Sequence, residues 1–122
     1  KLPAMALDAI NAWWEEHLGH GWYQMELDDN LGTPFVQLQM NFESPVTPRA
    51  RLICHVWPVK LGNTSITFRV DGFQDGKRCF SFRSVSVFIV ADEFKKCAPP
   101  KSVKDLVTPL LGPDWSDEHR GA

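Results

Sequence analysis

Two glutamates and a histidine stand side by side near the start of the chain, Glu15, Glu16 and His17 in the stretch NAWWEEH, and His20 follows shortly after. Carboxylates and imidazoles are common general acids and bases in hydrolytic enzymes. Neither histidine, however, has an acid or a nucleophile at a useful spacing, and the sequence has no G-x-S-x-G motif. We therefore expect the glutamates to face solvent or a partner subunit, and the histidines to serve in capping or packing.

A third acid, Asp8, stands earlier in the same region and is the only carboxylate of the first helical turns. The positive end of a helix dipole favours a negative charge there, so a purely stabilising role would account for this residue.

These side chains lie on a predicted helix that runs from Ala4 to Leu18. Pro3 suits a first helical turn, and Gly19 suits a C-terminal cap. Apolar and aromatic residues recur on one face of this helix, while polar residues occupy the other. The face expected to be buried holds Ala6, Ile10, Trp13 and His17, widened by Ala9 and Trp14.

Beyond a loop-like segment at residues 19–34, apolar residues alternate with a period of two, which predicts strands. The first strand, at residues 36–43, is expected to bury one face made of Val36, Leu38, Met40 and Phe42. The second, at residues 51–61, contains Pro58. Because proline cannot donate to a ladder, Pro58 indicates a bulge or a free edge.

Two further strands are predicted at residues 64–73 and 78–90, joined by the strong hairpin signal Asp75-Gly76. The last strand would be roughly 40 Å long, more than a domain of this size is wide, so the sheet must curve. The fold class is therefore α+β: one long central helix wrapped by a curved antiparallel sheet. Residues 91–122 extend this single domain, with a short helix expected at 102–111 and a loose tail at 112–122.

Composition narrows the possible functions. The 122 residues carry a formal net charge of −2 without a basic run, which gives no support to nucleic-acid binding. No apolar run is long enough to span a bilayer, and the three cysteines form no C-x-x-C motif. We expect a cytoplasmic protein with reduced thiols, no metal site, no cofactor and no membrane partner.

Four short motifs follow one another in a familiar order. They are Gly32-Thr33-Pro34 before a strand, Phe42-Glu43-Ser44-Pro45 at its end, the turn Leu61-Gly62-Asn63-Thr64-Ser65, and the final-strand segment Val85-Ser86-Val87-Phe88. With the preceding helix, this order resembles the acyl-CoA thioesterases of the hotdog fold, in the 4-hydroxybenzoyl-CoA thioesterase family. The resemblance covers roughly residues 5 to 91 and implies hydrolysis of an acyl-CoA to a free acid and coenzyme A.

The resemblance also implies roles for particular residues. Backbone N–H groups around Leu2 to Met5, at the start of the helix, would stabilise the oxyanion, and Asp8 matches an acid that one branch of the family carries within the helix. A tryptophan after the helix lines the acyl pocket in the aromatic-acyl members, which implies this role for Trp22. The remaining implied contacts are with coenzyme A, from Asn63, Thr64 and Ser65 in the strand turn and from Lys95 and Lys96 after the last strand.

Family members usually begin with a strand and a His-x-Asp-x-x-Gly motif that supplies the catalytic acid. Neither precedes the helix in this sequence, so we expect that strand and acid to lie upstream of Lys1. Because one curved sheet around one helix leaves an edge and half an acyl tunnel, the resemblance implies a homodimer or homotetramer. The tryptophans favour an aromatic or medium-chain acyl group.

Three alternatives remain. A hotdog dehydratase or hydratase needs a catalytic histidine with an acid on the helix, whereas His17 and His20 come at or after its end. A degenerate hotdog domain would bind acyl-CoA without hydrolysing it. A cystatin-like or nuclear-transport-factor-like module also places a helix before a curved sheet, although such modules usually have several N-terminal helices.

Overall fold

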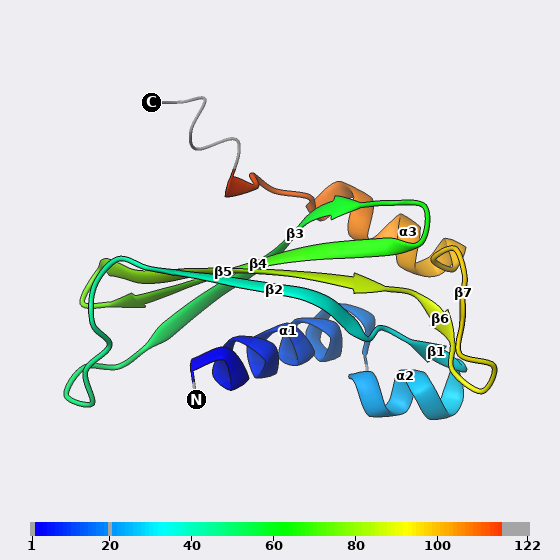
Figure 1. Cartoon of the computed structure of the whole chain (residues 1–122), viewed down its shortest axis with the longest axis horizontal. Coiled ribbons are helices and arrows are strands. Elements are labelled where there is room, and N and C mark those ends of the chain that lie inside the picture. The colour runs from blue at the N-terminus through cyan, green and yellow to red at the C-terminus, as the bar shows by residue number, and fades with distance from the viewer. Residues whose placement is uncertain (1, 20, 116–122) are drawn as a thin grey trace.

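A long helix lies along one face of a curved antiparallel sheet, as Figure 1 shows for the computed structural model, which describes residues 2–19 and 21–115. The described elements, in chain order, are α1 (Leu2–Leu18), α2 (Trp22–Asp28), β1 (Leu31–Gly32), β2 (Phe35–Phe42), β3 (Ile53–Leu61), β4 (Ser65–Gln74), β5 (Lys77–Val87), β6 (Ile89–Val90), β7 (Lys95–Lys96), α3 (Lys101–Val107) and the 3₁₀ turn η1 (Thr108–Leu110). None of the helices in this part of the chain is long and apolar enough to cross a membrane.

The main sheet has the strand order β2-β5-β4-β3, and each neighbouring pair is antiparallel. The predicted hairpin is confirmed: Asp75 and Gly76 join β4 to β5 with φ angles of 52° and 77°, the left-handed conformation that a two-residue hairpin turn requires. Both expectations for Pro58 are met, because β3 is an edge strand and its register shifts between Pro58 and Lys60. A smaller sheet, β1-β6-β7, lies beside the main one.

The predicted helix is confirmed, beginning two residues earlier than expected, and Gly19 follows it with a φ of 94°. Its apolar face forms the core with β4, and the rings of Trp13 and Trp14 meet the ring of Phe68 edge-on at 5.0 and 5.6 Å. The expected central position is corrected. The helix is N-terminal and packs on one face of the sheet, chiefly against β3 and β4, with no strands around it.

The segment predicted as a loop at residues 19–34 contains α2 and β1, so that prediction is wrong. Asn11 of α1 explains α2, because its Oδ1 accepts the backbone N–H of Trp22 at 2.9 Å and so caps the new helix. Gly21 fits beside it, since a Cβ there would lie 2.5 Å from the same oxygen. Met25 then anchors α2 in the core, fully buried.

The last predicted strand, at residues 78–90, is two strands. β5 ends at Val87, and the N–H of Phe88 donates to the carbonyl of Thr64 at 2.8 Å, after which β6 pairs with β1 in the second sheet. The chain therefore changes sheets where one long curved strand was expected.

Most of the apolar face predicted for residues 36–43 is not buried within one chain, although Met40 is partly buried against the core. Val36, Leu38 and Phe42 are 59%, 46% and 61% exposed. These side chains are exposed because β2 is an edge strand, whereas α1 packs on β3 and β4, toward the opposite edge of the sheet. An edge strand with exposed apolar side chains is a surface that another chain can cover.

The opposite face of the sheet contains a buried charge network. The carboxylate of Asp71 accepts from Nε and Nη2 of Arg69 at 2.9 and 3.0 Å, and from the hydroxyl of Ser81 at 2.7 Å. Nη1 of Arg78 adds a contact at 3.3 Å. The Arg69 guanidinium also lies 5.1 Å from the ring centre of Trp57.

Residues 112–115 form a strap across this network, so the expectation of a loose tail is wrong for these four residues. Asp114 accepts two hydrogen bonds from Arg83, both at 3.0 Å. The Trp115 indole N–H donates to Oγ of Ser81 at 2.6 Å. Gly112 fits against Trp57, since a Cβ there would lie 2.5 Å from its ring.

The strap is expected to loosen at low pH. Burial alone would raise the pKa of Asp114, but the hydrogen bonds from Arg83 and from the Trp115 N–H, with the charges of Arg83 and Arg69, outweigh it and lower this pKa. A lowered folded-state pKa stabilises the strap above the unfolded value of about 3.9 and ceases to do so as the pH falls through the folded value. Tryptophan fluorescence should therefore show a transition below about pH 4.

Asp114→Asn supplies the control for this prediction. The variant should give, already at neutral pH, the tryptophan spectrum that the unaltered chain reaches in acid, because a neutral amide at this position accepts less well from the guanidinium of Arg83. An identical acid transition in both proteins would show that Asp114 does not hold the strap.

Candidate functional site

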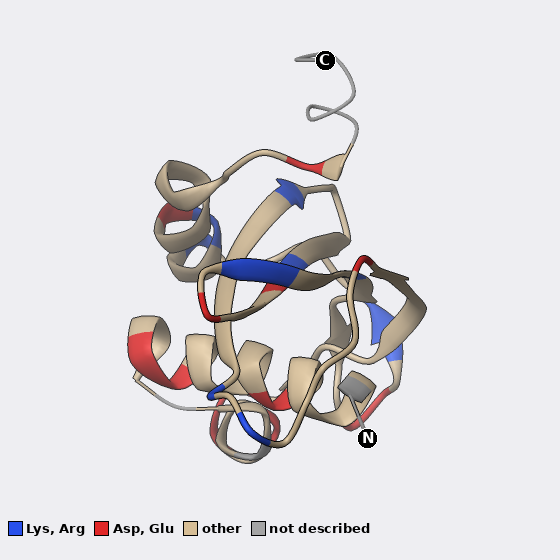
Figure 2. Ribbon diagram, turned by 90° about the vertical axis from the view of Figure 1, so that its left-hand side faces the viewer, with Lys and Arg blue, Asp and Glu red and all other residues tan. Residues whose placement is uncertain are grey.

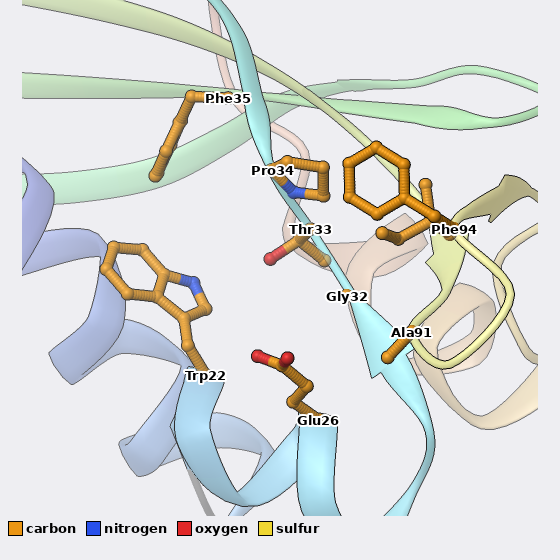
Figure 3. A pocket seen from close by; sticks show the side chains of 9 residues that line it. Trp22, Glu26, Gly32, Thr33, Pro34, Phe35, Ala91 and Phe94 are labelled. Carbon is orange, nitrogen blue, oxygen red and sulfur yellow. The ribbon is translucent and has the colours of Figure 1, made fainter.

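A cleft of about 290 Å³ opens beside α2, and we call it the α2 cleft. Aromatic and apolar side chains make most of its wall, with a carboxylate and a hydroxyl among them (Figure 3). Its lining consists of Trp22, Glu26, Gly32, Thr33, Pro34, Phe35, Ile89, Ala91 and Phe94. A mostly apolar cleft with a few polar groups is typical of a small-molecule site.

The Gly-x-Pro motif forms one side of this cleft, and its residue types follow from the local packing. A Cβ on Gly32 would lie 2.8 Å from Cγ1 of Ile89, the residue with which Gly32 pairs across β1 and β6. Pro34 then leads into β2, and its carbonyl accepts the N–H of Val87 at 3.1 Å. The motif therefore holds the small sheet close to the main one.

Trp22, the residue predicted to line an acyl pocket, does line the α2 cleft. Its ring meets the ring of Phe35 edge-on at 5.3 Å. Its backbone N–H donates to Oδ1 of Asn11. The first residue of α2 is thus positioned by a side chain from the middle of α1.

Two turns, one before β1 and one after β6, adjoin the cleft. Asn30 and Asp92 tie them together, because Nδ2 of Asn30 donates to the Asp92 carboxylate and its Oδ1 accepts the Asp92 N–H, both at 3.0 Å. Phe94 follows with a φ of 53°, which is uncommon for an aromatic residue, and its side chain is 76% exposed. Figure 3 shows its ring beside Pro34.

The predicted coenzyme A residues lie on two neighbouring segments, the turn before β4 and the strand β7, which bond to the chain at Phe88 and Ile89. Asn63 lines a second cleft, of about 250 Å³, together with Leu61, Gly62, Ala98, Pro99 and Lys104; we call it the turn cleft. Thr64 and Ser65 take part in the turn through their carbonyls, which accept the N–H groups of Phe88 and Gly62. Lys95 and Lys96 are exposed neighbours in β7, and adjacent strand residues point to opposite faces.

Asp8 is exposed in the N-terminal half of α1, and none of the clefts described here contains it. The α2 cleft lies at the other end of that helix (Figure 1). One chain therefore does not bring Asp8 and Trp22 together.

Among the NAWWEEH residues, Oε2 of Glu16 lies 3.8 Å from Nδ1 of His17. The His17 ring stacks on Trp13 at 4.3 Å, and its Nδ1 lies 3.0 Å from the Trp13 carbonyl, which confirms the packing role. Glu15 and Glu16 are exposed, and His20 lies outside the described residues. Cys54 borders the same shallow cleft as His17, and burial raises the pKa of its thiol, which disfavours the nucleophilic thiolate.

Sequence reasoning missed Glu26, Thr33 and Phe94 in the α2 cleft and Lys104 in the turn cleft. Thr33 could have been identified from the sequence, because it is the middle residue of the Gly-x-Pro motif. Glu26 follows Trp22 by four positions, so a helical reading of residues 22–28 would have placed both on one face.

Comparison with known proteins decides the family. The family model described as "Thioesterase superfamily" matches residues 4–80. The chain belongs to this superfamily. The resemblance to the hotdog thioesterases that four short motifs suggested is thereby confirmed.

The chain is also similar to solved structures of thioesterases. A thioesterase superfamily protein from Jannaschia sp. CCS1 is 53% identical, with a TM-score of 0.88 over 92% of this chain and 78% of that one. A 1,4-dihydroxy-2-naphthoyl-CoA thioesterase from Synechocystis is 16% identical, with a TM-score of 0.78 over 92% and 82% of the two chains. A gentisyl-coenzyme A thioesterase is 20% identical, with a TM-score of 0.70 over 82% and 76%. The last two show a shared fold, and none of the curated proteins compared with the chain matches it.

Proposed function

We propose that this thioesterase hydrolyses an acyl-CoA with a small aromatic or medium-chain acyl group to the free acid and coenzyme A, in the cytoplasm. The observation that carries the proposal is the α2 cleft, an aromatic-lined pocket that contains Trp22 in a member of the thioesterase superfamily. Its volume is at the small end of ligand pockets, which suits a single ring better than a long chain.

Charge supports placing coenzyme A away from α1 and α2. Residues 2–30 contain no lysine or arginine, and all their charged side chains are acidic, as the helical layer of Figure 2 shows. Phosphates are repelled by such a surface and attracted to basic groups. In the proposal, the acyl group occupies the α2 cleft, and the nucleotide end reaches Asn63, Thr64 and Ser65 at the turn cleft, with Lys95, Lys96 and Lys104 near its phosphates.

The chemistry requires a carboxylate and an oxyanion site. In the proposal, Asp8 takes a proton from the water that attacks the thioester carbonyl, and the carboxyl group then returns this proton to the released thiolate of coenzyme A. The backbone N–H groups of Leu2, Ala4 and Met5 have no partners within the helix, and they would donate to the oxyanion that develops on the carbonyl oxygen.

A second copy of the chain would unite these parts. β2 offers a free edge with exposed Leu38 and Phe42 beside it. If two β2 strands pair antiparallel about a two-fold axis, the partner's α1 runs in the opposite direction, and its N-terminal half approaches this chain's α2 cleft. We therefore propose a homodimer, or a tetramer built from such dimers, with sites shared between two chains.

Leu38→Arg tests this assembly. The substitution places a charge at the centre of the proposed interface, which should weaken association by about 2–5 kcal/mol, or roughly 30-fold to several thousand-fold. Size-exclusion chromatography should show a monomer with an unchanged circular dichroism spectrum, and turnover should fall with the dimer fraction.

Leu110→Arg is the matched control, since Leu110 is also an exposed leucine but lies on η1, away from β2. It should leave both assembly and turnover unchanged. A monomeric Leu38→Arg protein with full turnover would contradict a site shared between chains.

A panel of acyl-CoA thioesters, with thiol release as the readout, tests the function itself. We expect turnover to be fastest with small aromatic acyl groups. Failure to release thiol from any thioester would refute the hydrolase, and tight binding without turnover would favour the acyl-CoA-binding alternative. Hydration of an enoyl-CoA would favour the hydratase.

A further inference from the structure

We propose that Glu26 determines acyl-group specificity by selecting groups that carry a hydrogen-bond donor at the end far from the thioester, and by rejecting groups that end in a carboxylate. This inference rests on the proposed function, because it takes the α2 cleft as the acyl pocket. It concerns a residue outside the four motifs and outside the proposed chemistry.

The position of Glu26 within the cleft is the first observation. It is the one ionisable side chain among the lining residues, whose wall is otherwise dominated by Trp22, Pro34, Phe35 and Phe94. Figure 3 shows its carboxylate directed into the space between the Trp22 indole and Thr33. The described residues, 2–19 and 21–115, provide it with no hydrogen bond or ion pair.

The neighbouring polar groups are the second observation. The Trp22 indole nitrogen and the Thr33 hydroxyl face the same space as the Glu26 carboxylate (Figure 3). A carboxylate only accepts hydrogen bonds, an indole N–H only donates, and a hydroxyl does both. A distal hydroxyl or amine could therefore donate to Glu26, and a hydroxyl could also accept from the indole.

The charge of Glu26 is the basis of this selection. A hydrogen bond to an ionised acceptor is about twice as strong as a neutral one. Glu26 is exposed at the edge of the cleft, so a ligand donor replaces water there. A second carboxylate in the same cleft would meet like-charge repulsion without a cation to offset it. The helix that carries Glu26 is held in place, because Asn11 caps α2 and the neighbouring Met25 is fully buried.

The test compares Glu26→Gln with the unaltered full chain on four CoA thioesters: phenylacetyl-CoA and its 4-hydroxy, 4-aminomethyl and 4-carboxy derivatives. The unaltered protein should prefer the two donor-bearing thioesters to the 4-carboxy one. In Glu26→Gln, the ratio of kcat/KM for 4-aminomethyl over 4-carboxy should fall about tenfold or more. The 4-hydroxy thioester should lose less, since the amide oxygen still accepts, and phenylacetyl-CoA should change within about twofold.

Asp28→Asn is the matched control, because Asp28 is an exposed carboxylate on the same helix that does not line the cleft. It should leave every ratio as in the unaltered protein. Unchanged ratios in Glu26→Gln, or an equal change in Asp28→Asn, would overturn the role of Glu26 while the hydrolase stands.

Failure of the proposed function has a different signature. If the unaltered chain hydrolyses neither these four thioesters nor any member of the acyl-CoA panel, the hydrolase is refuted. The same ratios are then taken from dissociation constants measured by calorimetry. A preference for donors that Glu26→Gln removes would then still support the inference. Equal affinities for all four thioesters, or no binding, would overturn it.

Discussion

Replacing Asp8 by asparagine should lower kcat for thioester hydrolysis by about 10²- to 10⁴-fold, the usual contribution of a general base. Asparagine keeps the shape of the side chain but cannot take a proton from water. Asp8 is exposed on α1, so the change should cost little stability. The free energy of unfolding, measured by thermal denaturation, should stay within about 1 kcal/mol of that of the unaltered protein. KM should change much less than kcat, because the acyl group binds elsewhere in the proposal.

Glu16→Gln provides the comparison. Glu16 is an exposed carboxylate on the same helix, and it borders the shallow cleft of His17 and Cys54 instead of the α2 cleft. Its replacement should leave kcat unchanged. If Asp8→Asn also left kcat unchanged, Asp8 would have only the stabilising role that its place near the start of a helix allows.

Replacing Asp71 by alanine should have the largest effect on stability, a loss of about 3–5 kcal/mol in the free energy of unfolding. The side chains of Asp71 and Arg69 are 5% and 1% exposed, so the substitution would leave the guanidinium buried without its carboxylate. The hydroxyl of Ser81 would lose its acceptor as well, and Trp115 of the strap bonds to that hydroxyl. Total stabilities of about 5–15 kcal/mol are usual, so this is a large fraction.

Urea unfolding followed by circular dichroism measures this loss as a shift of the midpoint. Asp105→Ala is the control, because Asp105 also forms an ion pair, with Lys101 at 2.7 Å, but both side chains are mostly exposed. Such an i,i+4 pair contributes about 0.3–0.5 kcal/mol. Equal shifts in the two variants would show that burial does not set the importance of the Asp71 network.

Periodicity predicted those parts of the fold in which local sequence and tertiary environment agree. The helix and the hairpin at Asp75-Gly76 are set by residues a few positions apart, and both were found as predicted. β2 shows where the argument fails. The alternation of Leu38 and Phe42 with polar residues predicts a strand correctly, but not whether its apolar face is covered by the same chain or by another.

The candidate site divides in the same way. The place of Trp22 could be predicted because a family resemblance assigns a tryptophan to it, and the structure puts Trp22 in the α2 cleft. The other lining residues Glu26 and Phe94 could not be predicted. Glu26 lies on a helix that the sequence suggested was a loop, and Phe94 lies in a turn between two-residue strands. No periodicity develops in elements this short.

The sequence by itself determined the helix, the strands of the main sheet and the superfamily, because the spacing of apolar residues and the four motifs are local properties of the chain. Only the tertiary structure decided how NAWWEEH is used. Asn11 caps α2, Trp13 and Trp14 anchor the core, and His17 stacks on Trp13. These roles depend on groups that the fold brings together from distant positions, such as Phe68, and no local pattern encodes such distances.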